Sequence, residues 1–229
     1  MYNNKSFLAI IPARGGSKRL PKKNILDLLG KPLIAWSIEA GLKSKYIDKV
    51  IVSSDDEKIL KVAKEYGANT IKRPEYLAND MATTFDTLKH TVDNIENYDY
   101  IILLQPTSPL RNEVHIDESI ELLDSKNADA IISVCKMEHS PQWSNSLPDD
   151  DNMGDFIADE IKNIRSQDLE PFYRLNGAIY ICEIGRFLKE ESLFIKDKIF
   201  AYKMDKYNSV DIDEEIDFKI AQFFAKEMN

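Results

Sequence analysis

The sequence predicts an α/β fold in which one mostly parallel sheet carries helices on both faces. Short apolar runs rich in β-branched residues alternate with helical patterns from the first residues onward. Runs that are apolar throughout are typical of parallel strands, because helices cover both faces of such a sheet. A chain of 229 residues with 43% hydrophobic and 30% charged residues suits one domain over residues 1–229.

Five buried strands and four helices are predicted in the first part of the chain. Pro32 is expected at the first position of the first helix, where no backbone N–H partner is needed. Asp55 is expected to cap the second helix, which ends at Gly67. Two crossover helices are expected over residues 83–95 and 113–123, and the strands are residues 7–12, 49–53, 69–72, 100–104 and 130–135. Ligands of such a fold bind beyond the carboxyl ends of the strands.

The alternation breaks over residues 136–173, which form an excursion from the sheet. Prolines and the acidic run 149–151 interrupt any long periodic pattern there. The excursion carries apolar side chains that the sheet need not cover, which predicts either a dimerisation arm or a lid on its own domain. These side chains are Trp143, Phe156, Ile157, Ile161 and Ile164. Strands over 178–182 and 200–204 and an amphipathic helix over 214–227 complete the chain.

Composition and charge exclude several classes of protein. A surplus of 39 acidic over 30 basic side chains gives a net charge of −9, which argues against a partner that is nucleic acid or an anionic membrane. Cys135 and Cys182 lie in apolar runs without CxxC spacing, so neither a disulfide framework nor a zinc site is expected. The first apolar run is too short for a signal sequence or a membrane span. We therefore expect a soluble, cytoplasmic protein.

A basic loop follows the first strand, at residues 13–24, and inverts the charge of the chain locally. It contains five cations and no acid: Arg14, Lys18, Arg19, Lys22 and Lys23. Gly15 and Gly16 would let backbone N–H groups approach a ligand, so the loop suits a polyphosphate. A solvated basic loop is the alternative. Neither a GxxxxGK[ST] nor a GxGxxG frame is present, which excludes two familiar modes of nucleotide binding.

Five short sequence blocks, spread over nearly the whole chain, together resemble a known family. Residues 11–19 read IPARGGSKR and are followed by PKKN at 21–24. The later blocks are RP at 73–74 with LANDMATT at 77–84, LQPTSPLR at 104–111, RLNGAIY at 174–180 and DID at 211–213. In this order they resemble the acylneuraminate cytidylyltransferases, also called CMP-sialic acid synthetases. The resemblance implies a Rossmann-like sheet of the nucleotide-diphospho-sugar transferase type, a homodimer, and the Mg²⁺-dependent reaction of CTP with a nonulosonic acid to give a CMP-sugar and pyrophosphate.

The nucleotide side of the site follows from the first two blocks. The resemblance implies that Arg14, Lys18 and Lys23 neutralise the triphosphate and the leaving pyrophosphate as catalytic cations. It also implies nucleotide contacts by Gly15, Gly16, Ser17 and Asn24, and cytosine recognition by Arg73, the Ala82 backbone and Thr84, where the family more often has serine. A surface arginine is the alternative for Arg73, and a turn or cap residue for Asn24.

The sugar side follows from the later blocks. Gln105 ends a buried strand, prolines stiffen the following turn, and the resemblance implies that its amide binds the acyl sugar. The sugar carboxylate needs a cation, for which Arg165 in the excursion is the first candidate, across the interface if the excursion is a dimer arm. Asn176 and Tyr180 lie four apart on a strand and so share a face, with core packing as the alternative for Tyr180. Arg111, Arg174 and Phe194 are further sugar-side candidates.

Two aspartates are the metal candidates. Asp211 and Asp213 alternate in an extended segment, so both carboxylates point to one face and suit Mg²⁺ together with phosphate oxygens. An N-cap for the last helix is the alternative for Asp213. The three histidines form neither an HxxxH pair nor a triad, and no residue is identified as the base that removes the sugar proton.

The excursion departs from the family pattern on the sugar side. Trp143 follows Gln142 where bacterial sialate enzymes place a lysine, and the spacing from Arg165 to Arg174 is one residue longer. A tryptophan in place of a cation favours a less polar acceptor, such as the diacylamido sugar legionaminate, with N-acetylneuraminate left open. The sequence Gln105-Pro106-Thr107 counts against a 3-deoxy-manno-octulosonate cytidylyltransferase, because it lacks the aspartate that those enzymes carry just after the glutamine. A glycosyltransferase that uses a nucleotide sugar is disfavoured, because it would not explain the basic loop. A nucleotide-binding module without activity is also disfavoured, because the phosphate cations and the metal aspartates are all present.

Overall fold

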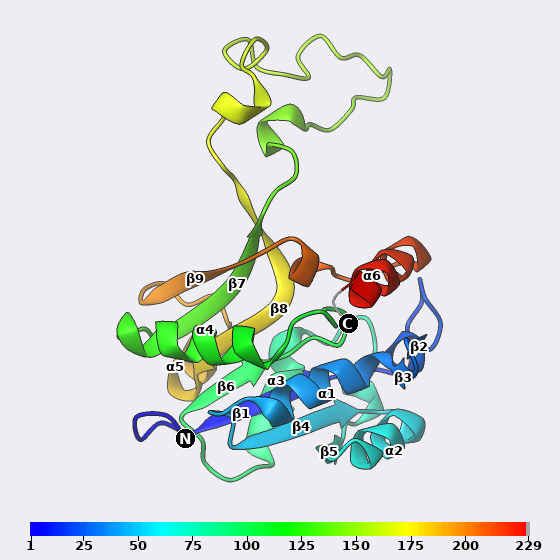
Figure 1. Ribbon diagram of the computed structural model, residues 1–229, viewed down its shortest axis with the longest axis vertical. Helices are drawn as coiled ribbons and strands as arrows, with labels where there is room; N and C mark the ends of the chain where they lie inside the picture. The colour runs from blue at the N-terminus through cyan, green and yellow to red at the C-terminus, as the bar shows by residue number, and fades with distance from the viewer. Residues whose placement is uncertain (228–229) are drawn as a thin grey trace.

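The computed structural model describes residues 1–227 and has a seven-stranded sheet at its centre (Figure 1). The strand order is β5-β4-β1-β6-β8-β7-β9, and every strand runs in the same direction except β8, which is antiparallel to both neighbours. The bounds are β1 Phe7–Pro12, β4 Lys49–Ser54, β5 Asn69–Lys72, β6 Tyr100–Leu103, β7 Ala130–Lys136, β8 Tyr173–Glu183 and β9 Ile199–Met204. The predicted mostly parallel sheet is confirmed.

Helices cover both faces of the sheet, as predicted. Alternate residues of β1 belong to different cores: Phe7, Ala9 and Ile11 pack with three helices, and Leu8 and Ile10 pack with two others. On the first face lie α1 Leu33–Lys43, α2 Glu57–Glu65 and α4 Glu113–Ser125, and on the second face α3 Thr84–Asp93 and α5 Ile184–Glu190. The residues of β1 and β6 are buried on both faces of the sheet, which explains why these two strands are apolar throughout.

The last helix packs on a small hairpin rather than on the sheet. A two-stranded ribbon of β2 Asp27–Leu28 and β3 Lys31–Pro32 follows the basic loop. Leu28, Leu33 and Ile212 form a separate apolar cluster with Ala221 of α6 Glu215–Glu227. The segment before α6 is thereby held against the basic loop, at the carboxyl end of the sheet.

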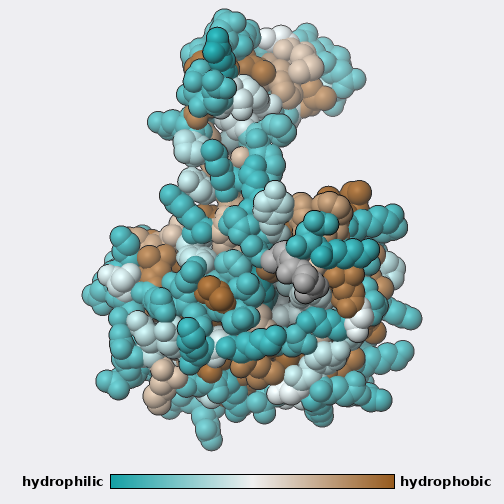
Figure 2. Space-filling view, viewed as in Figure 1, coloured by the Kyte–Doolittle hydropathy of each residue, from teal (hydrophilic) through white to brown (hydrophobic). Residues whose placement is uncertain are grey.

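Residues 137–172 project from the body of the molecule on the two strands β7 and β8 (Figure 1). The last paired residues are Lys136 and Tyr173, and beyond them the Met137 N–H donates to the Phe172 carbonyl. Apolar surface is visible on this excursion in Figure 2, and its exposed apolar residues include Leu147, Met153 and Ile164. The excursion does not fold back over its own domain, so the alternative of a lid is wrong. The other alternative, a dimerisation arm, stays a prediction.

The roles predicted for Pro32 and Asp55 at helix starts are wrong by one residue. Pro32 is the N-cap rather than the first residue of α1, because it still pairs with Asp27 in the hairpin. Asp56, not Asp55, caps α2 by accepting from the Lys58 N–H, while the Asp55 carboxylate accepts from the Gly15 N–H. The helix α5 was not predicted. Within residues 1–227, no helix is long and apolar enough to cross a membrane.

Candidate active site

Four loops meet at the carboxyl ends of the parallel strands. Arg14 follows β1, Asp55 follows β4, Arg73 follows β5 and Gln105 follows β6. The Arg73 N–H donates to the Ser54 carbonyl at 2.8 Å, and the Asp55 carboxylate lies 3.8 Å from the Arg73 guanidinium. Side chains distant in the sequence are therefore gathered on one edge, as expected for this kind of sheet.

The largest cavity at this edge measures about 560 Å³ and is lined by the basic loop. Its cationic wall contains Arg14, Lys18, Arg19 and Lys23, and Asn24 and Ser17 also line it. Asp80 lines the same cavity, 2.9 Å from Arg14 and 2.5 Å from Lys18. These two cations hold the pKa of Asp80 below its usual range, Lys18 contributing more than Arg14. Two of the three predicted phosphate-binding cations, Arg14 and Lys18, are thus paired with an anion of the protein itself.

The conformation of the basic loop depends on Gly15 and on a hydrogen bond from Asn24. A Cβ atom on Gly15 would lie 2.8 Å from an Asp56 carboxylate oxygen, so the loop can approach α2 only with glycine at this position. The buried Asn24 amide donates to the Arg14 carbonyl at 3.0 Å. Gly16, by contrast, has open space where a Cβ would lie. The turn role left open for Asn24 is therefore the one that its contacts favour.

Asp211 and Asp213 line the same cavity, on the side of the segment that precedes α6. The Ile212 N–H donates to the Thr107 carbonyl at 2.8 Å, which fixes this segment beside the loop of Gln105. Asp213 lies 3.3 Å from Lys23 and 3.0 Å from Arg19. Burial raises the pKa of the Asp211 carboxyl, and the negative charge of Asp213 raises it further. Two carboxylates therefore line the same cavity as the cations of the basic loop.

A second cavity, of about 330 Å³, adjoins the first and contains the predicted base-reading residues. Arg73, Ala82 and Thr84 all line it. Arg73 is 5% exposed and donates to the Thr87 hydroxyl at 2.9 Å, so the alternative of a surface arginine is wrong. Burial lowers the pKa of its guanidinium, and its Nε atom has no hydrogen-bond partner in the described structure. The Ala82 N–H donates to the Asn79 side-chain oxygen at 3.1 Å.

A third cavity, of about 290 Å³, has aromatic walls. Tyr180 and Phe194 line it, with their ring centroids 6.2 Å apart in an edge-on arrangement. Gln105 lines all three cavities and so lies where they meet. Gly177 lies beneath it at φ +71°, and a Cβ atom there would lie 2.6 Å from the Gln105 side-chain oxygen. Gln105, Tyr180 and Phe194 are therefore brought together as predicted.

Asn176 is not brought into this cavity, contrary to the shared-face argument. Its side chain is fully buried and bonded to Ser133, Ser209 and the sulfur of Met204. The pairing of β7 with β8 is irregular here, since Ile132 pairs with Tyr180 but Val134 with Leu175. This bulge, with Gly177 at its centre, breaks the two-residue alternation between Asn176 and Tyr180.

Two of the predicted arginines also lie outside the cavities of the sugar side. Arg111 is 1% exposed and donates to Ser37, the Gln105 carbonyl and the Ala178 carbonyl, so it supports the Gln105 turn from below. Burial lowers the pKa of its guanidinium. Arg174 is half-buried and donates to the carbonyls of Leu175 and Ser209. Neither arginine lines the third, aromatic cavity.

Arg165 lies on the projecting excursion, exposed and away from the three cavities of its own chain (Figure 1). The structure therefore does not bring Arg165 together with the other predicted sugar-side residues of its own chain.

Several cavity residues were not predicted. Asp80 belongs to the LANDMATT block at residues 77–84, and its negative charge could have indicated a contact with the basic loop. Thr107 and Leu20 line the first cavity, and Phe85, Phe187 and Leu193 line the aromatic one. The apolar character of most of these residues is equally typical of core residues, so the sequence carries no signal for their role.

Comparisons with known proteins give a consistent result. A family model described as cytidylyltransferase matches residues 8–221. An N-acylneuraminate cytidylyltransferase of Escherichia coli is 39% identical over 223 residues, which cover 97% of this chain and 52% of the relative. A CMP-N,N′-diacetyllegionaminic acid synthase of Legionella pneumophila is 34% identical, with 94% of each chain covered. A pseudaminic acid cytidylyltransferase of Campylobacter jejuni is 34% identical, with 96% of each covered.

The chain spans about half the length of the N-acylneuraminate cytidylyltransferases it matches. Among solved structures, a CMP:2-keto-3-deoxy-manno-octonic acid synthetase complexed with CTP is similar with a TM-score of 0.74 and 18% identity, covering 98% of this chain and all of the other. A 4-diphosphocytidyl-2C-methyl-D-erythritol synthase from Anaerococcus prevotii has a TM-score of 0.68 at 16% identity, covering 97% of this chain and 99% of the other. These structures confirm the fold.

Proposed function

The chain belongs to the cytidylyltransferase family, and from that premise we propose that it transfers CMP from CTP to a nonulosonic, sialic-type acid. The anomeric hydroxyl of the sugar attacks the α-phosphorus in line, a bond from the sugar oxygen to this phosphorus forms, and the bond to the β-phosphate oxygen breaks. The hydroxyl proton is lost to a base or to water, and pyrophosphate leaves. The relatives of similar length are named for legionaminic and pseudaminic acids, which supports this class of acceptor.

The observation that carries the proposal is the position of Gln105 at the junction of three cavities. One cavity has a cationic wall, the second is lined by a buried arginine, and the third by aromatic rings. A triphosphate, a base and a sugar acid with acyl groups match these three linings respectively. The reacting α-phosphate would then lie near Gln105, between nucleotide and sugar.

The nucleotide is held from two sides in this proposal. Arg14, Lys18 and Lys23 bind the phosphates and stabilise the charge that develops on the leaving pyrophosphate. Gly15, Gly16 and Ser17 bring the loop backbone to the phosphates. Cytosine needs donors for O2 and N3 and an acceptor for its exocyclic amine, which Arg73, the Thr84 hydroxyl and the Ala82 carbonyl can supply.

Asp211 and Asp213 fit a Mg²⁺ ion by the chemistry of their donors. Both carboxylates line the phosphate cavity, and the raised pKa of Asp211 indicates that a cation beside it would stabilise its ionised form. When bound, Mg²⁺ would neutralise phosphate charge and orient the triphosphate. Lys23, which donates to the Ile212 carbonyl at 2.5 Å, keeps this pair beside the basic loop.

The excursion supplies the partner-dependent part of the proposal. We take residues 137–172 as a dimerisation arm that buries its exposed apolar residues against a second subunit. Arg165 would then meet the sugar carboxylate in the partner's cavity. A homodimer in the cytoplasm is the expected form of this enzyme.

The acceptor is distinguished by its acyl groups. Tyr180, Phe194 and Trp143 of the arm favour a diacylamido sugar such as N,N′-diacetyllegionaminate over N-acetylneuraminate. Comparable kcat/KM for N-acetylneuraminate, with a large loss for legionaminate, would contradict this preference.

The test is pyrophosphate release from CTP with Mg²⁺ and four sugars in parallel: N-acetylneuraminate, N,N′-diacetyllegionaminate, pseudaminate and 3-deoxy-manno-octulosonate. ATP, GTP and UTP serve as nucleotide controls. We expect release with CTP and a nonulosonate and little with the other nucleotides. Release only with 3-deoxy-manno-octulosonate, or with none of the sugars, would contradict the proposal.

A further inference from the structure

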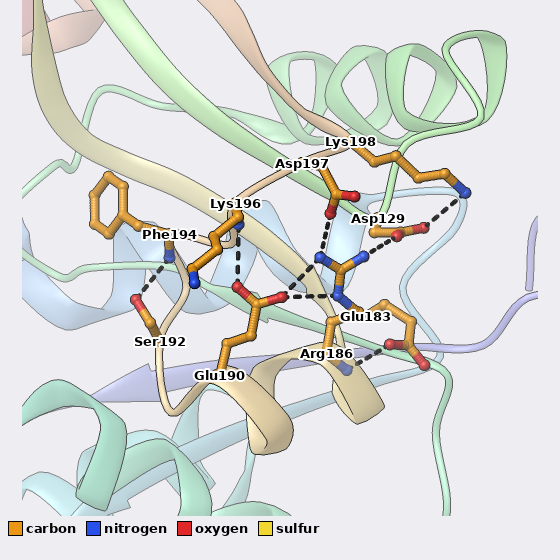
Figure 3. A network of polar contacts seen from close by, with 9 residues as sticks. All are labelled: Asp129, Glu183, Arg186, Glu190, Ser192, Phe194, Lys196, Asp197 and Lys198. Atoms are coloured by element: carbon orange, nitrogen blue, oxygen red, sulfur yellow. Dashed lines mark hydrogen bonds and ion pairs between the residues drawn. The ribbon is translucent and has the colours of Figure 1, made fainter.

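A cluster of charges lies beside the acceptor cavity, on residues that no role above uses. Its centre is Arg186 of α5, which donates to Asp129 at 2.7 Å, to Glu190 at 2.7 and 3.0 Å, and to Asp197 (Figure 3). All three nitrogens of the guanidinium are thereby occupied by carboxylates. These contacts join α5, the start of β7 and the loop 191–198.

The loop 191–198 carries one wall of the acceptor cavity. Phe194 lies at its middle, 54% exposed, between Leu193 and Ile195, which are both buried in the core. The two buried side chains attach the loop to the domain and leave Phe194 turned outward against Tyr180. Glu191 and Lys198 at the loop ends have a φ of 52°, a conformation that side chains rarely adopt. The loop therefore depends on contacts that hold this shape.

The charge cluster supplies such contacts at three points of the loop. Glu190 uses its second oxygen to accept the Lys196 N–H at 3.0 Å, two residues from Phe194. Asp197 bonds Arg186 through its side chain, and the Lys198 carbonyl accepts from the Asp129 N–H at 2.9 Å. Figure 3 shows Asp197 beside the Arg186 guanidinium and Lys196 bonded to Glu190, with Phe194 farther along the same loop, where its N–H donates to the Ser192 hydroxyl.

We propose that Arg186 is a positioning residue for the acceptor cavity, because through Glu190 and Asp197 it sets the place of Phe194 against Tyr180. That the cavity binds a sugar rests on the proposed function, whereas the positioning of Phe194 rests on the contacts alone. Without Arg186, three carboxylates would remain together with Lys198, which lies 3.9 Å from Asp129. Their repulsion would move the loop outward while Leu193 and Ile195 still hold it to the core.

The kinetic test compares Arg186→Gln and Arg186→Lys with Lys5→Gln. Lys5 pairs with Asp124 at a burial close to that of Arg186 and Asp129, far from the loop in sequence, so it controls for loss of an ion pair. We expect Arg186→Gln to raise the KM for the sugar about tenfold and the KM for CTP less than about twofold. Lysine keeps the charge but not the planar fork and should rescue in part. Equal changes in both KM values, or no change, would overturn the proposal.

A second variant tests whether Arg186 acts through Phe194. In a Phe194→Ala background, Arg186→Gln should change the KM for the sugar less than about twofold, because the group it positions is gone. An undiminished tenfold effect in that background would overturn the proposal. If Arg186→Gln fails to fold, Asp197→Asn removes a single bond of the cluster and should shift the same KM by a smaller factor.

Hydrogen exchange of the amides of residues 191–198 is independent of the reaction. Arg186→Gln should accelerate exchange at Lys196, whose N–H loses its fixed acceptor, and leave the sheet amides unchanged. Unchanged exchange in the loop would overturn the positioning role. A wild-type protein inactive with every sugar, but with this change in exchange, would contradict the proposed function and leave the geometry of the loop supported.

Discussion

Gly177→Ala is the substitution that most directly tests the position of Gln105. Gly177 has φ +71°, and an added Cβ atom would lie 2.6 Å from the Gln105 side-chain oxygen, 3.2 Å from the Ser108 hydroxyl and 3.5 Å from an Asp211 oxygen. The left-handed backbone costs an alanine about 1–2 kcal/mol. The contact at 2.6 Å is with the end of a flexible side chain, so Gln105 will move aside rather than unfold the protein.

Gly30→Ala is the matched control, because Gly30 has φ +86° and open space where its Cβ would lie. Both variants should lose about 1–2 kcal/mol, which lowers Tm by about 3–6 °C for a chain of this size. Only Gly177→Ala should lose activity, by about a hundredfold, because the junction of the three cavities is displaced.

The assays are thermal unfolding and pyrophosphate release from CTP with the accepted sugar. A Gly177→Ala variant with the Tm of Gly30→Ala and the rate of the wild type would refute the placement of Gln105 beside the reacting groups. A Tm far below that of Gly30→Ala would refute the view that the Gln105 side chain yields.

Three further substitutions test the phosphate cavity. Arg14→Ala should lower kcat about a hundredfold with Tm unchanged, because this half-exposed cation acts on developing charge, and a wild-type kcat would contradict its role. Asp80→Asn should lower the KM for CTP about threefold, since the carboxylate competes with phosphate for Arg14 and Lys18. Because these cations hold the pKa of Asp80 low, this gain should persist from about pH 6 to 8 in steady-state kinetics, and a raised KM would count against it. Asp211→Asn should abolish most activity, with partial recovery at high Mg²⁺, yet raise Tm by about 2 °C at about pH 7. The sign follows from the raised pKa of Asp211, since burial makes the folded state prefer the protonated carboxyl. Ionisation of Asp211 therefore lowers the stability of the folded state above this raised pKa, and the loss disappears below the pKa of the unfolded state. A lowered Tm of Asp211→Asn in calorimetry would contradict this sign.

The sheet could be predicted because its signal is local. Strands β1 and β6 are apolar along their length, and the polar groups that follow the parallel strands must gather at one edge. The cations of the basic loop, Arg73, Gln105 and Asp211 were placed by this rule together with the family resemblance. Their arrangement in three adjoining cavities agrees with it.

Asn176 shows why other side chains were misplaced. The alternation argument assumes a regular strand, but Gly177 at φ +71° inserts a bulge that turns Asn176 into the core. Arg111 was misplaced because nothing in a sequence separates a buried arginine that supports a turn from one that binds a ligand. The Arg186 cluster depends on α5, β7 and a loop that meet only in the folded chain.

The most direct measurement is mass spectrometry of the products formed from CTP, Mg²⁺ and a nonulosonic acid labelled in its anomeric oxygen. The account predicts a CMP-sugar that retains the label in the bridge to phosphorus, formed in equal amount with pyrophosphate. A product without the label, or CMP and pyrophosphate formed without any CMP-sugar, would contradict attack by the sugar hydroxyl on the α-phosphate in this site.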